Sequence, residues 1–323
     1  MKKEERNPIR ARGLRMIPFD NHDEWLAIRH GYIGGSDAGA IIGMNPYNSA
    51  FAVWAEKTGK TEPFGGNIAT RTGTLIEDLV ARLFMEETGK KVQKLNFTLV
   101  NDAYPFACAN LDREIIGEDA FLECKTTNNL VNVKKFRNGE FPDVWYAQVT
   151  HYMAVTGAKK AYLAVLSECR DFRIFELERD EDEIAALMDF ERAFWNDYVL
   201  TGQTPPADGH SATSSAIRQM WPEDDGDAAD LTECAEALEQ RKALNEQIKA
   251  LKTEVDALDN SIKTVMGDAA KGSCGRFTVS WKLQNTSALD REKIKADYPD
   301  IDFSRYTSQS RVYRVTEKKE KTA

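Results

Sequence analysis

The sequence predicts an α/β fold, a central mixed sheet flanked by helices, with a C-terminal helical and β appendage. Between residues 74 and 200, helical and strand periodicities follow one another in the order α, βββ, α, ββ, α, which is typical of one mixed α/β domain. A stretch rich in Pro, Gly, Ser and Asp, 206–230, then predicts an acidic linker. From Leu244 onward, apolar residues alternate spacings of four and three, as in a coiled coil or a helical hairpin.

The composition is that of a globular protein without a membrane span. The chain has 323 residues and a mass of 36.4 kDa, and 42% of its residues are hydrophobic. No apolar run approaches the roughly 18 residues of a membrane helix. The five cysteines lack metal-site spacing and the N-terminus lacks a secretory apolar block, so we expect a reduced, cytoplasmic environment. A net charge of −9 argues against indiscriminate nucleic-acid binding, although basic residues gather in 2–15 and 271–323.

The first elements of the chain follow a basic start. Residues 1–18 are predicted to be disordered, and the catalytic domain is expected over 19–205. It opens with a helix around residues 25–29, a glycine turn and a second helix begun by Ser36 or Asp37.

An amphipathic helix is predicted over residues 74–88. Because a helix turns ~100° per residue, Glu77 falls within about 20° of Phe84, at the margin of the apolar stripe. Asp78 points away from that stripe. We therefore expect Glu77, and not Asp78, to face the fold.

The remaining elements of the domain alternate between strands and helices. Three strand-like runs are expected to form a meander, and the helix that follows, from Pro142 to Gly157, has Gln148 beside its apolar stripe. Two further strands and a long helix complete the order. The expected elements after residue 90 are strands near 94–100, 104–116 and 120–127, the helix near 143–156, strands 159–167 and 171–179, and a helix from about Glu181 to Leu200.

The C-terminal appendage is expected over 231–323. Its apolar seam spans about three heptads, so a packed helix and an oligomerising coil both remain open. The tail from Gly275 onward is predicted to form two strands around a short helix.

A group of charged residues lies in the strand-like segments after residue 110. Alternation along a strand places Glu123 and Lys125 on one face and Cys124 on the other. Together with Asp112, Glu123 offers the hard oxygen ligands that Mg²⁺ and Mn²⁺ prefer. Phosphodiester hydrolysis often uses two such ions, ~3.5–4 Å apart.

Each residue of this group has an expected role. Asp112 would bridge two ions, and Glu123 and the main-chain carbonyl of Cys124 would ligate one of them. Lys125 would position or deprotonate the attacking water, with a pKa lowered by desolvation. A Glu/Lys pair on a solvated strand face is the structural alternative, but the apolar and β-branched surroundings in FLECKTT favour an interior strand.

Five stretches within residues 20–200 carry a family resemblance: WLAIRHGYIGGSDAGAIIGMNPY, TGTLIEDLVARLFMEETG, ACANLDREI, LECKTT and WYAQVTHYMAVTGAKKAYLAVL. They resemble the PD-(D/E)xK nuclease superfamily, and specifically the phage lambda exonuclease and YqaJ-type viral recombinase family. The resemblance implies a PD-(D/E)xK nuclease core. It implies that the catalytic residues are Asp112, Glu123, Lys125, Glu77 and Gln148, and that the metal ligands are Asp112, Glu123, the Cys124 carbonyl and Glu77, the last directly or through water.

The resemblance also implies a site for a terminal 5′ phosphate. Arg29 and Ser36 match the positions that hold this group in such exonucleases, and Asn110 is a further candidate contact. An arginine fork beside a helix N-terminus reached through two glycines is chemically suited to an anion. A surface arginine and an ordinary N-cap are the alternative interpretation.

The expected function is a Mg²⁺-dependent 5′-to-3′ exonuclease that digests one strand of duplex DNA ends and leaves a 3′ single strand for phage-type recombination. Mn²⁺ is expected to substitute. The alternatives are a nuclease of the same superfamily that cuts internally or at branched structures, and a non-catalytic DNA-binding or assembly subunit.

The resemblance implies the partners as well. These are double-stranded DNA ends and a single-strand annealing protein of the RecT or phage beta type. A homo-oligomer is expected, with a trimeric ring around DNA as one form, in the cytoplasm of a bacterial host and of phage or prophage origin.

Overall fold

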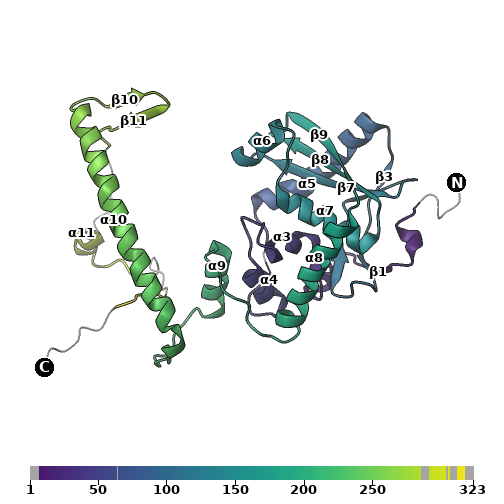
Figure 1. The fold of residues 1–323 in the computed structure, drawn as a ribbon, viewed down its shortest axis with the longest axis horizontal. Helices are drawn as coiled ribbons and strands as arrows, with labels where there is room; N and C mark the ends of the chain where they lie inside the picture. Colours follow the sequence, from purple (N-terminus) through teal and green to yellow (C-terminus); the bar gives the residue numbers. More distant parts are fainter. Residues whose placement is uncertain (1–6, 64, 285–290, 303–304, 306–310, 317–323) are drawn as a thin grey trace. The chain divides into compact units, whose positions relative to one another are not determined.

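The structure is a computed structural model that describes residues 7–63, 65–284, 291–302, 305 and 311–316. The chain divides into two compact units, Met1–Pro222 and Glu223–Ala323 (Figure 1). Over the described residues, no helix is both long and apolar enough to cross a membrane.

The first unit is a mixed α/β domain built on two sheets. The larger sheet has the strand order β3-β6-β7-β8-β9, and all of its pairs are antiparallel except β7 with β8. That parallel pair is possible because helices α6 and α7 form the crossover between the two strands. The bounds are β3 Val92–Gln93, β6 Arg113–Ile115, β7 Ala120–Thr127, β8 Lys160–Ser167, β9 Asp171–Glu178, α6 Leu130–Arg137 and α7 Asp143–Thr156.

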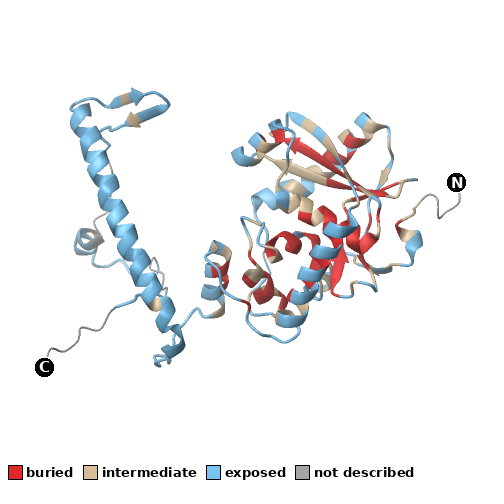
Figure 2. Cartoon of the chain, in the orientation of Figure 1, coloured by how far each residue is buried: buried red, intermediate tan, exposed pale blue. Residues whose placement is uncertain are grey.

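The smaller sheet has the order β1-β4-β5-β2, with β2 and β5 parallel. Helices of the same unit pack on both sheets, and Figure 2 shows the buried residues gathered between them. The bounds are β1 Arg15–Pro18, β2 Ile33–Gly34, β4 Phe97–Val100, β5 Ala107–Ala109, α2 His22–His30, α3 Gly35–Ile41, α4 Ala50–Lys57, α5 Ile68–Thr88, α8 Glu181–Phe194 with a π-helical turn Trp195–Val199, and α9 Ser211–Met220.

The expected three-strand meander is wrong. The run 104–116 is not one strand: β5 pairs with β4 in the smaller sheet, and β6 pairs with β7 in the larger one. The chain changes sheets between Asn110 and Asp112. As a result, Asp112 lies in a connection at the start of β6.

The expected disorder of residues 1–18 is wrong for residues 7–18, and residues 1–6 lie outside the described part. Strand β1 pairs with β4, and Ile9 is fully buried in the main core. Arg10 and Arg12 also form ion pairs, with Glu114 and Asp119. The basic residues misled the prediction because their charges are matched by acids distant in sequence.

The expected linker 206–230 is wrong for residues 211–220. These form α9, which packs against α4 and buries Thr213 and Ala216. The hydroxyl of Thr213 also donates to that of Ser49, at 2.8 Å. The first unit therefore extends to Pro222.

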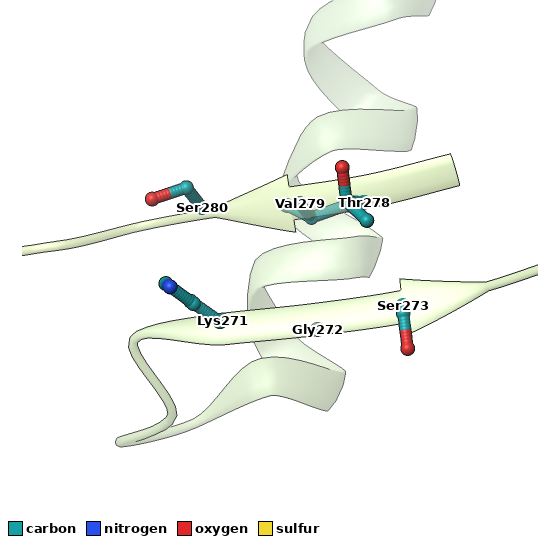
Figure 3. Close-up of a pocket in the computed structure, with 6 residues that line it drawn as sticks. All are labelled: Lys271, Gly272, Ser273, Thr278, Val279 and Ser280. Carbon is teal, nitrogen blue, oxygen red and sulfur yellow. The ribbon is translucent and has the colours of Figure 1, made fainter. Parts of the chain in front are cut away.

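Among its described residues, the second unit has a 3-10 turn Thr232–Cys234, one long helix, a hairpin and a short helix. Helix α10 spans Ala235–Met266, strands β10 Lys271–Cys274 and β11 Phe277–Ser280 pair as an antiparallel hairpin, and α11 spans Arg291–Asp297. Figure 3 shows Lys271 and Ser273 on β10, with Thr278 and Ser280 on β11, around an open hollow on the hairpin. The first expected strand and the short helix of the tail correspond to β11 and α11, β10 was not expected, and the second expected strand falls largely outside the described residues.

Candidate active site

Strand β7 carries the predicted residues from a buried start to a more open end. Its first four residues are buried and its last four are half-buried. Glu123 is 2% exposed, whereas the side chain of Lys125 is 20% exposed. Cys124 points to the other face, where it packs against the apolar cluster beneath α5. The strand thus delivers a charged pair to an accessible end of a rigid sheet.

Glu123, Lys125 and Gln148 form one hydrogen-bonded group. The Lys125 ammonium donates to Glu123 Oε1 at 2.7 Å and to Gln148 Oε1 at 2.8 Å. Gln148 Nε2, from α7, donates to the same Glu123 oxygen at 2.8 Å. The structure therefore brings the residues of β7 and α7 together.

Asp112 joins the group from the connection before β6. Its Oδ2 accepts a hydrogen bond from the Cys124 main-chain N–H at 2.7 Å. Burial raises the pKa of Asp112 well above its usual value, and the nearby charges of Glu123 and Glu77 raise it further. The three carboxyl groups therefore share one electrostatic environment.

Glu77 reaches this environment from α5, as its place on the helix predicted. Its side chain is 18% exposed and accepts a hydrogen bond from Arg113 Nη1. The expectation that Asp78 points away is only partly right. Its side chain is mostly exposed, yet it accepts from Arg113 Nη2. Arg113 thus holds both acids of α5 against β6.

The pKa predicted for Lys125 has the wrong direction. Burial by itself lowers the pKa of the ammonium, but the charges of Glu123 and Asp112 outweigh burial and raise it. Glu123 shows the complementary effect, since burial raises its pKa despite Lys125. In this arrangement Lys125 is a protonated hydrogen-bond donor, not a free base.

The residues present fit a divalent cation in their chemistry. Glu123 Oε2 is buried and has no hydrogen-bond partner, which is costly for a carboxylate oxygen unless a cation or a donor approaches it. Among the described residues, the carboxylates of Asp112, Glu123 and Glu77 meet the ammonium of Lys125 and the guanidinium of Arg113, which is shared with Asp78. Hard oxygen donors in such excess suit Mg²⁺ or Mn²⁺.

The donors are, however, engaged with protein groups. Within the described residues, no three His, Cys, Asp or Glu side chains stand in an arrangement ready to hold a metal ion. The reason is visible in the contacts: Asp112 Oδ2 faces an amide, Glu123 Oε1 faces Lys125, and Glu77 faces Arg113. An ion would have to draw these oxygens toward itself.

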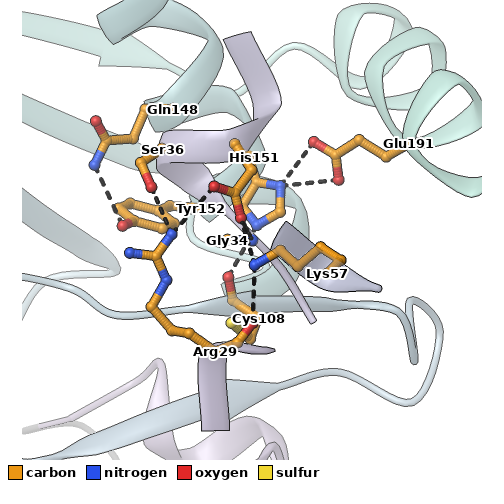
Figure 4. Close-up of polar contacts among 10 residues, drawn as sticks. Arg29, Gly34, Ser36, Lys57, Cys108, Gln148, His151, Tyr152 and Glu191 are labelled. Atoms are coloured by element: carbon orange, nitrogen blue, oxygen red, sulfur yellow. Dashed lines mark hydrogen bonds and ion pairs between the residues drawn. The ribbon is translucent and has the colours of Figure 1, made fainter. Parts of the chain in front are cut away.

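Arg29 and Ser36 meet beside this group, as predicted (Figure 4). Arg29 Nη2 donates to Ser36 Oγ at 2.6 Å and lies 3.3 Å from Asp37 Oδ1. Nη1 and Nε make no hydrogen bond to any described residue. The guanidinium also lies 4.9 Å from the ring centre of Trp25. Arg29 is therefore held on one edge and keeps donors for an incoming acceptor.

The start of α3 differs from the prediction. Gly34 is the N-cap, so neither Ser36 nor Asp37 begins the helix. Asp37 instead turns back to accept from the Gly34 N–H at 3.0 Å. Burial would raise the pKa of Asp37, but Lys57, 3.0 Å away, and Arg29 hold it well below its usual value. Asp37 is thus an anionic anchor for both cations.

The anchor and the carboxylate group are joined by a close helix contact. A Cβ placed on Gly35 would lie 2.5 Å from Tyr152 Cε1 and 3.0 Å from Gln148 Cγ. Only glycine allows α3 to approach α7 this closely. The Tyr152 hydroxyl in turn lies 3.3 Å from Gln148 Nε2. The start of α3 is therefore packed against the residue that touches both Glu123 and Lys125.

Asn110 makes a structural contact. Its Nδ2 donates to the Thr98 hydroxyl at 2.8 Å, across the two strands β4 and β5. None of its hydrogen bonds among the described residues involves Arg29 or Ser36.

Sequence reasoning missed Lys57, Asp37 and Tyr152 as members of the site. Lys57 is 6% exposed and also donates to the Arg29 carbonyl at 2.9 Å. A lysine at the end of an apolar helix gives no signal of its partner, because Asp37 is distant in sequence. Tyr152 lies one helical turn after Gln148, and that spacing could have indicated it.

His151 makes structural contacts. The ring is fully buried between Glu191, at 2.8 Å from Nδ1, and the Cys108 carbonyl, at 2.9 Å from Nε2. Burial would lower the pKa of His151, but Glu191 outweighs it and raises it. The pair ties α7 and α8 to β5.

Fold and site together define a mixed α/β protein with a carboxylate and lysine site at the open end of a central strand. Residues 24–159 match the family described as the YqaJ-like viral recombinase domain. The chain is 39% identical over 286 residues to the uncharacterized protein YqaJ of Bacillus subtilis (strain 168). The matched segment covers 87% of this chain and 89% of that relative. The chain belongs to the YqaJ-like viral recombinase family.

Two solved structures are similar to part of the chain. One is an alkaline exonuclease from Laribacter hongkongensis, with a TM-score of 0.47 and 20% identity, covering 55% of this chain and 92% of that one. The other is a phage-related exonuclease from Haemophilus somnus 129PT, with a TM-score of 0.43 and 12% identity, covering 55% of this chain and 100% of that one.

Proposed function

We propose that this chain is a Mg²⁺-dependent 5′-to-3′ exonuclease that digests one strand of duplex DNA ends and leaves a 3′ single strand for recombination. The observation that carries the proposal is the group of Glu123, Lys125 and Gln148 beside Asp112, with one buried Glu123 oxygen left without a partner. Membership of a viral recombinase family supports the recombination role.

The proposed metal ligands are Asp112, Glu123, the Cys124 carbonyl and Glu77, the last directly or through water. Mg²⁺ or Mn²⁺ bound there would offset the charge that gathers on the phosphate and lower the pKa of a bound water. An amide and Lys125 hold the carboxylates of Asp112 and Glu123 in place, so an ion bound there would compete with these contacts for their oxygens.

Lys125 has the role of a charged donor in this proposal. Because Glu123 and Asp112 keep it protonated, it would orient water or the scissile phosphate by donating N–H bonds, not by removing a proton. Gln148 fixes its direction through the bond to Oε1. A fixed donor is effective because it need not reorganise as charge develops.

Arg29 and Ser36 are proposed to bind the terminal 5′ phosphate. Arg29 retains donors on Nη1 and Nε, while Asp37 and Trp25 hold its position. Because α3 packs on Gln148 through Gly35, a phosphate held there would lie next to the hydrolytic group. This adjacency is what would give the enzyme its polarity.

The proposed partners follow the family. They are duplex DNA ends and a single-strand annealing protein, and a ring of subunits around the product strand would make digestion processive. Asn110 is left out of the proposed phosphate contacts because its amide is bound to Thr98.

The test compares linear duplex, labelled on either end, with supercoiled circular DNA, in Mg²⁺ or EDTA. Shortening of the 5′-ended strand of the linear DNA only, and only with metal, is the expected result. Nicking of the circle would instead indicate an internally cutting nuclease, and DNA binding with no nucleotide release would indicate a non-catalytic subunit.

A second comparison tests the phosphate site. Arg29→Ala should slow digestion of 5′-phosphorylated ends by about 10- to 100-fold, as expected for a lost charge-assisted contact, and have less effect on 5′-hydroxyl ends. Arg15→Ala is the matched control, because Arg15 binds Tyr32 on the surface. An equal loss on both kinds of end would refute the role of Arg29.

A further inference from the structure

Helix α10 exposes an unbroken apolar seam. Figure 2 shows the helix exposed along almost its entire length. Neither the hairpin of the second unit nor α11 covers the seam residues, which stay exposed to water. The exposed fractions are 58% for Leu244, 62% for Ile248, 60% for Leu251, 55% for Val255, 66% for Leu258, 44% for Ile262 and 89% for Val265. Scattered surface leucines are ordinary, but a continuous stripe marks an interaction surface.

The seam has the spacing of a coiled coil. Spacings of four and three place Ile248, Val255 and Ile262 at the a positions of successive heptads, and Leu244, Leu251 and Leu258 at the d positions. Every a residue is β-branched and every one of these d residues is leucine. This combination favours a parallel coiled coil of two helices over one of three or four, because the side chains at a and at d point into the interface in different directions.

The seam has a defined beginning within the chain. The a position before Ile248 is Arg241, whose guanidinium lies 5.5 Å from the ring centre of Tyr313 in the same unit. A cation at this position is engaged within its own chain, so the apolar layers start at Leu244. They end near Val265, where Gly267 terminates the helix.

We propose that α10 pairs in parallel with α10 of a second copy of this chain, as a two-stranded coiled coil over residues 244–265. Full burial of an aliphatic side chain removes roughly 60–120 Å² from water. The seven seam residues are about three-fifths exposed on average, so pairing would bury roughly 500–1,000 Å² of apolar surface over both chains. The flanking positions add to this and bring the total to about the 1,200 Å² of a small stable interface.

The flanking charges give the pair a recognisable property. In a parallel coil the g position of one helix faces the following e position of its partner. Glu254 at g would then face Asp259 at e of the second copy, twice by symmetry. Like charges there weaken the pair, so raising the salt concentration should tighten it.

The proposal is tested on the full-length chain by light scattering after size exclusion, from about 5 to about 200 µM, because assembly depends on concentration. The expected wild-type mass is an even multiple of the 36.4 kDa of one chain, and twice the mass of the Leu258→Glu variant. Leu258→Glu should weaken association by about 100-fold or more, since it places a charge in the buried seam. Asn260→Glu adds the same charge on the outer face of the helix and should leave the mass unchanged.

A third variant reports the orientation of the helices. Asp259→Lys converts two repulsive pairs into attractive ones in the parallel arrangement and should tighten association by about tenfold. In the two antiparallel registers that overlap the seam most, position 259 instead faces Asn245 or Lys252, so no tightening is expected. A dimer that Asp259→Lys fails to tighten therefore overturns the parallel arrangement.

The remaining outcomes are equally decisive. A wild-type chain that stays at the mass of one copy up to the highest concentration overturns the proposal. So does a wild-type mass that Leu258→Glu leaves unchanged. None of these variants touches Asp112, Glu123 or Lys125, so the result does not depend on the proposed nuclease activity.

Discussion

Replacing Glu123 by glutamine should abolish stabilisation of the protein by Mn²⁺ or Mg²⁺. Glutamine keeps the size and the shape of the side chain but removes the charge. The buried Oε2, which has no partner in the structure, is the atom that a cation would approach. Without the carboxylate charge, the attraction for a divalent ion falls by several kcal/mol at an effective dielectric constant of about 20.

The size of the effect follows from binding linkage. At a metal concentration of about 100 times the dissociation constant, a single bound ion stabilises the wild-type fold by about 2.7 kcal/mol. For a unit that ends at Pro222, each kcal/mol shifts the melting temperature by about 2–4 °C. The wild type should therefore melt about 5–11 °C higher with metal than with EDTA. A variant that binds about 100-fold more weakly should gain only about 1 °C.

The assay is thermal unfolding followed by circular dichroism, with and without Mn²⁺, in the absence of DNA. Glu118→Gln is the matched control: Glu118 contacts Lys90 and Tyr162 and no residue of the site, so it should keep the full metal shift. An equal metal shift in wild type and Glu123→Gln would refute the assignment of Glu123 as a ligand. This holds whatever the DNA substrate proves to be.

Two further predictions concern the packing that supports the site. Gly35→Ala should destabilise the fold by about 1–3 kcal/mol, because the new methyl group would lie 2.5 Å from Tyr152. The control Gly209→Ala, which has open space around it, should change the melting temperature little. Equal melting temperatures of the two variants would show that α3 and α7 are not held together at Gly35. The raised pKa of His151 adds stability that is fully present below about pH 6.5 and is lost as the pH rises through the pKa of the folded state. The free energy of unfolding of the wild type, measured in urea, should therefore fall as the pH rises through that window. The His151→Gln variant should have a lower free energy of unfolding at pH 6 and a weaker dependence on pH above it. The same pH dependence in both proteins would contradict the role of this proton.

The relative placement of several site residues could be predicted without knowing the fold in detail. Glu123 and Lys125 share a face because residues two apart in any strand do so. Glu77 and Gln148 lie at the margins of amphipathic helices, whose apolar stripes must face the sheet. These relations are local, so the sequence contains them. The metal itself stays a prediction, to be decided by the Glu123→Gln comparison.

The failures of prediction concern contacts between distant segments. The basic N-terminus was expected to be disordered, yet Glu114 and Asp119 form ion pairs with Arg10 and Arg12. The direction of the Lys125 pKa failed for the same reason: burial was foreseen, but the sequence does not state how close Asp112 and Glu123 would come. The balance between desolvation and charge depends on distances of a few ångströms.

By itself, the sequence determined the amphipathic helices that carry Glu77 and Gln148, the shared face of Glu123 and Lys125, and the seam of α10, because each follows from the repeat of a single element. Only the tertiary structure decided that the run after residue 104 divides between two sheets, that Asp37 and Lys57 hold Arg29, and that Gly35 admits α7 close to α3. Those features depend on which surfaces meet when the chain folds, and the free energy of such contacts is set by atoms far apart in the sequence.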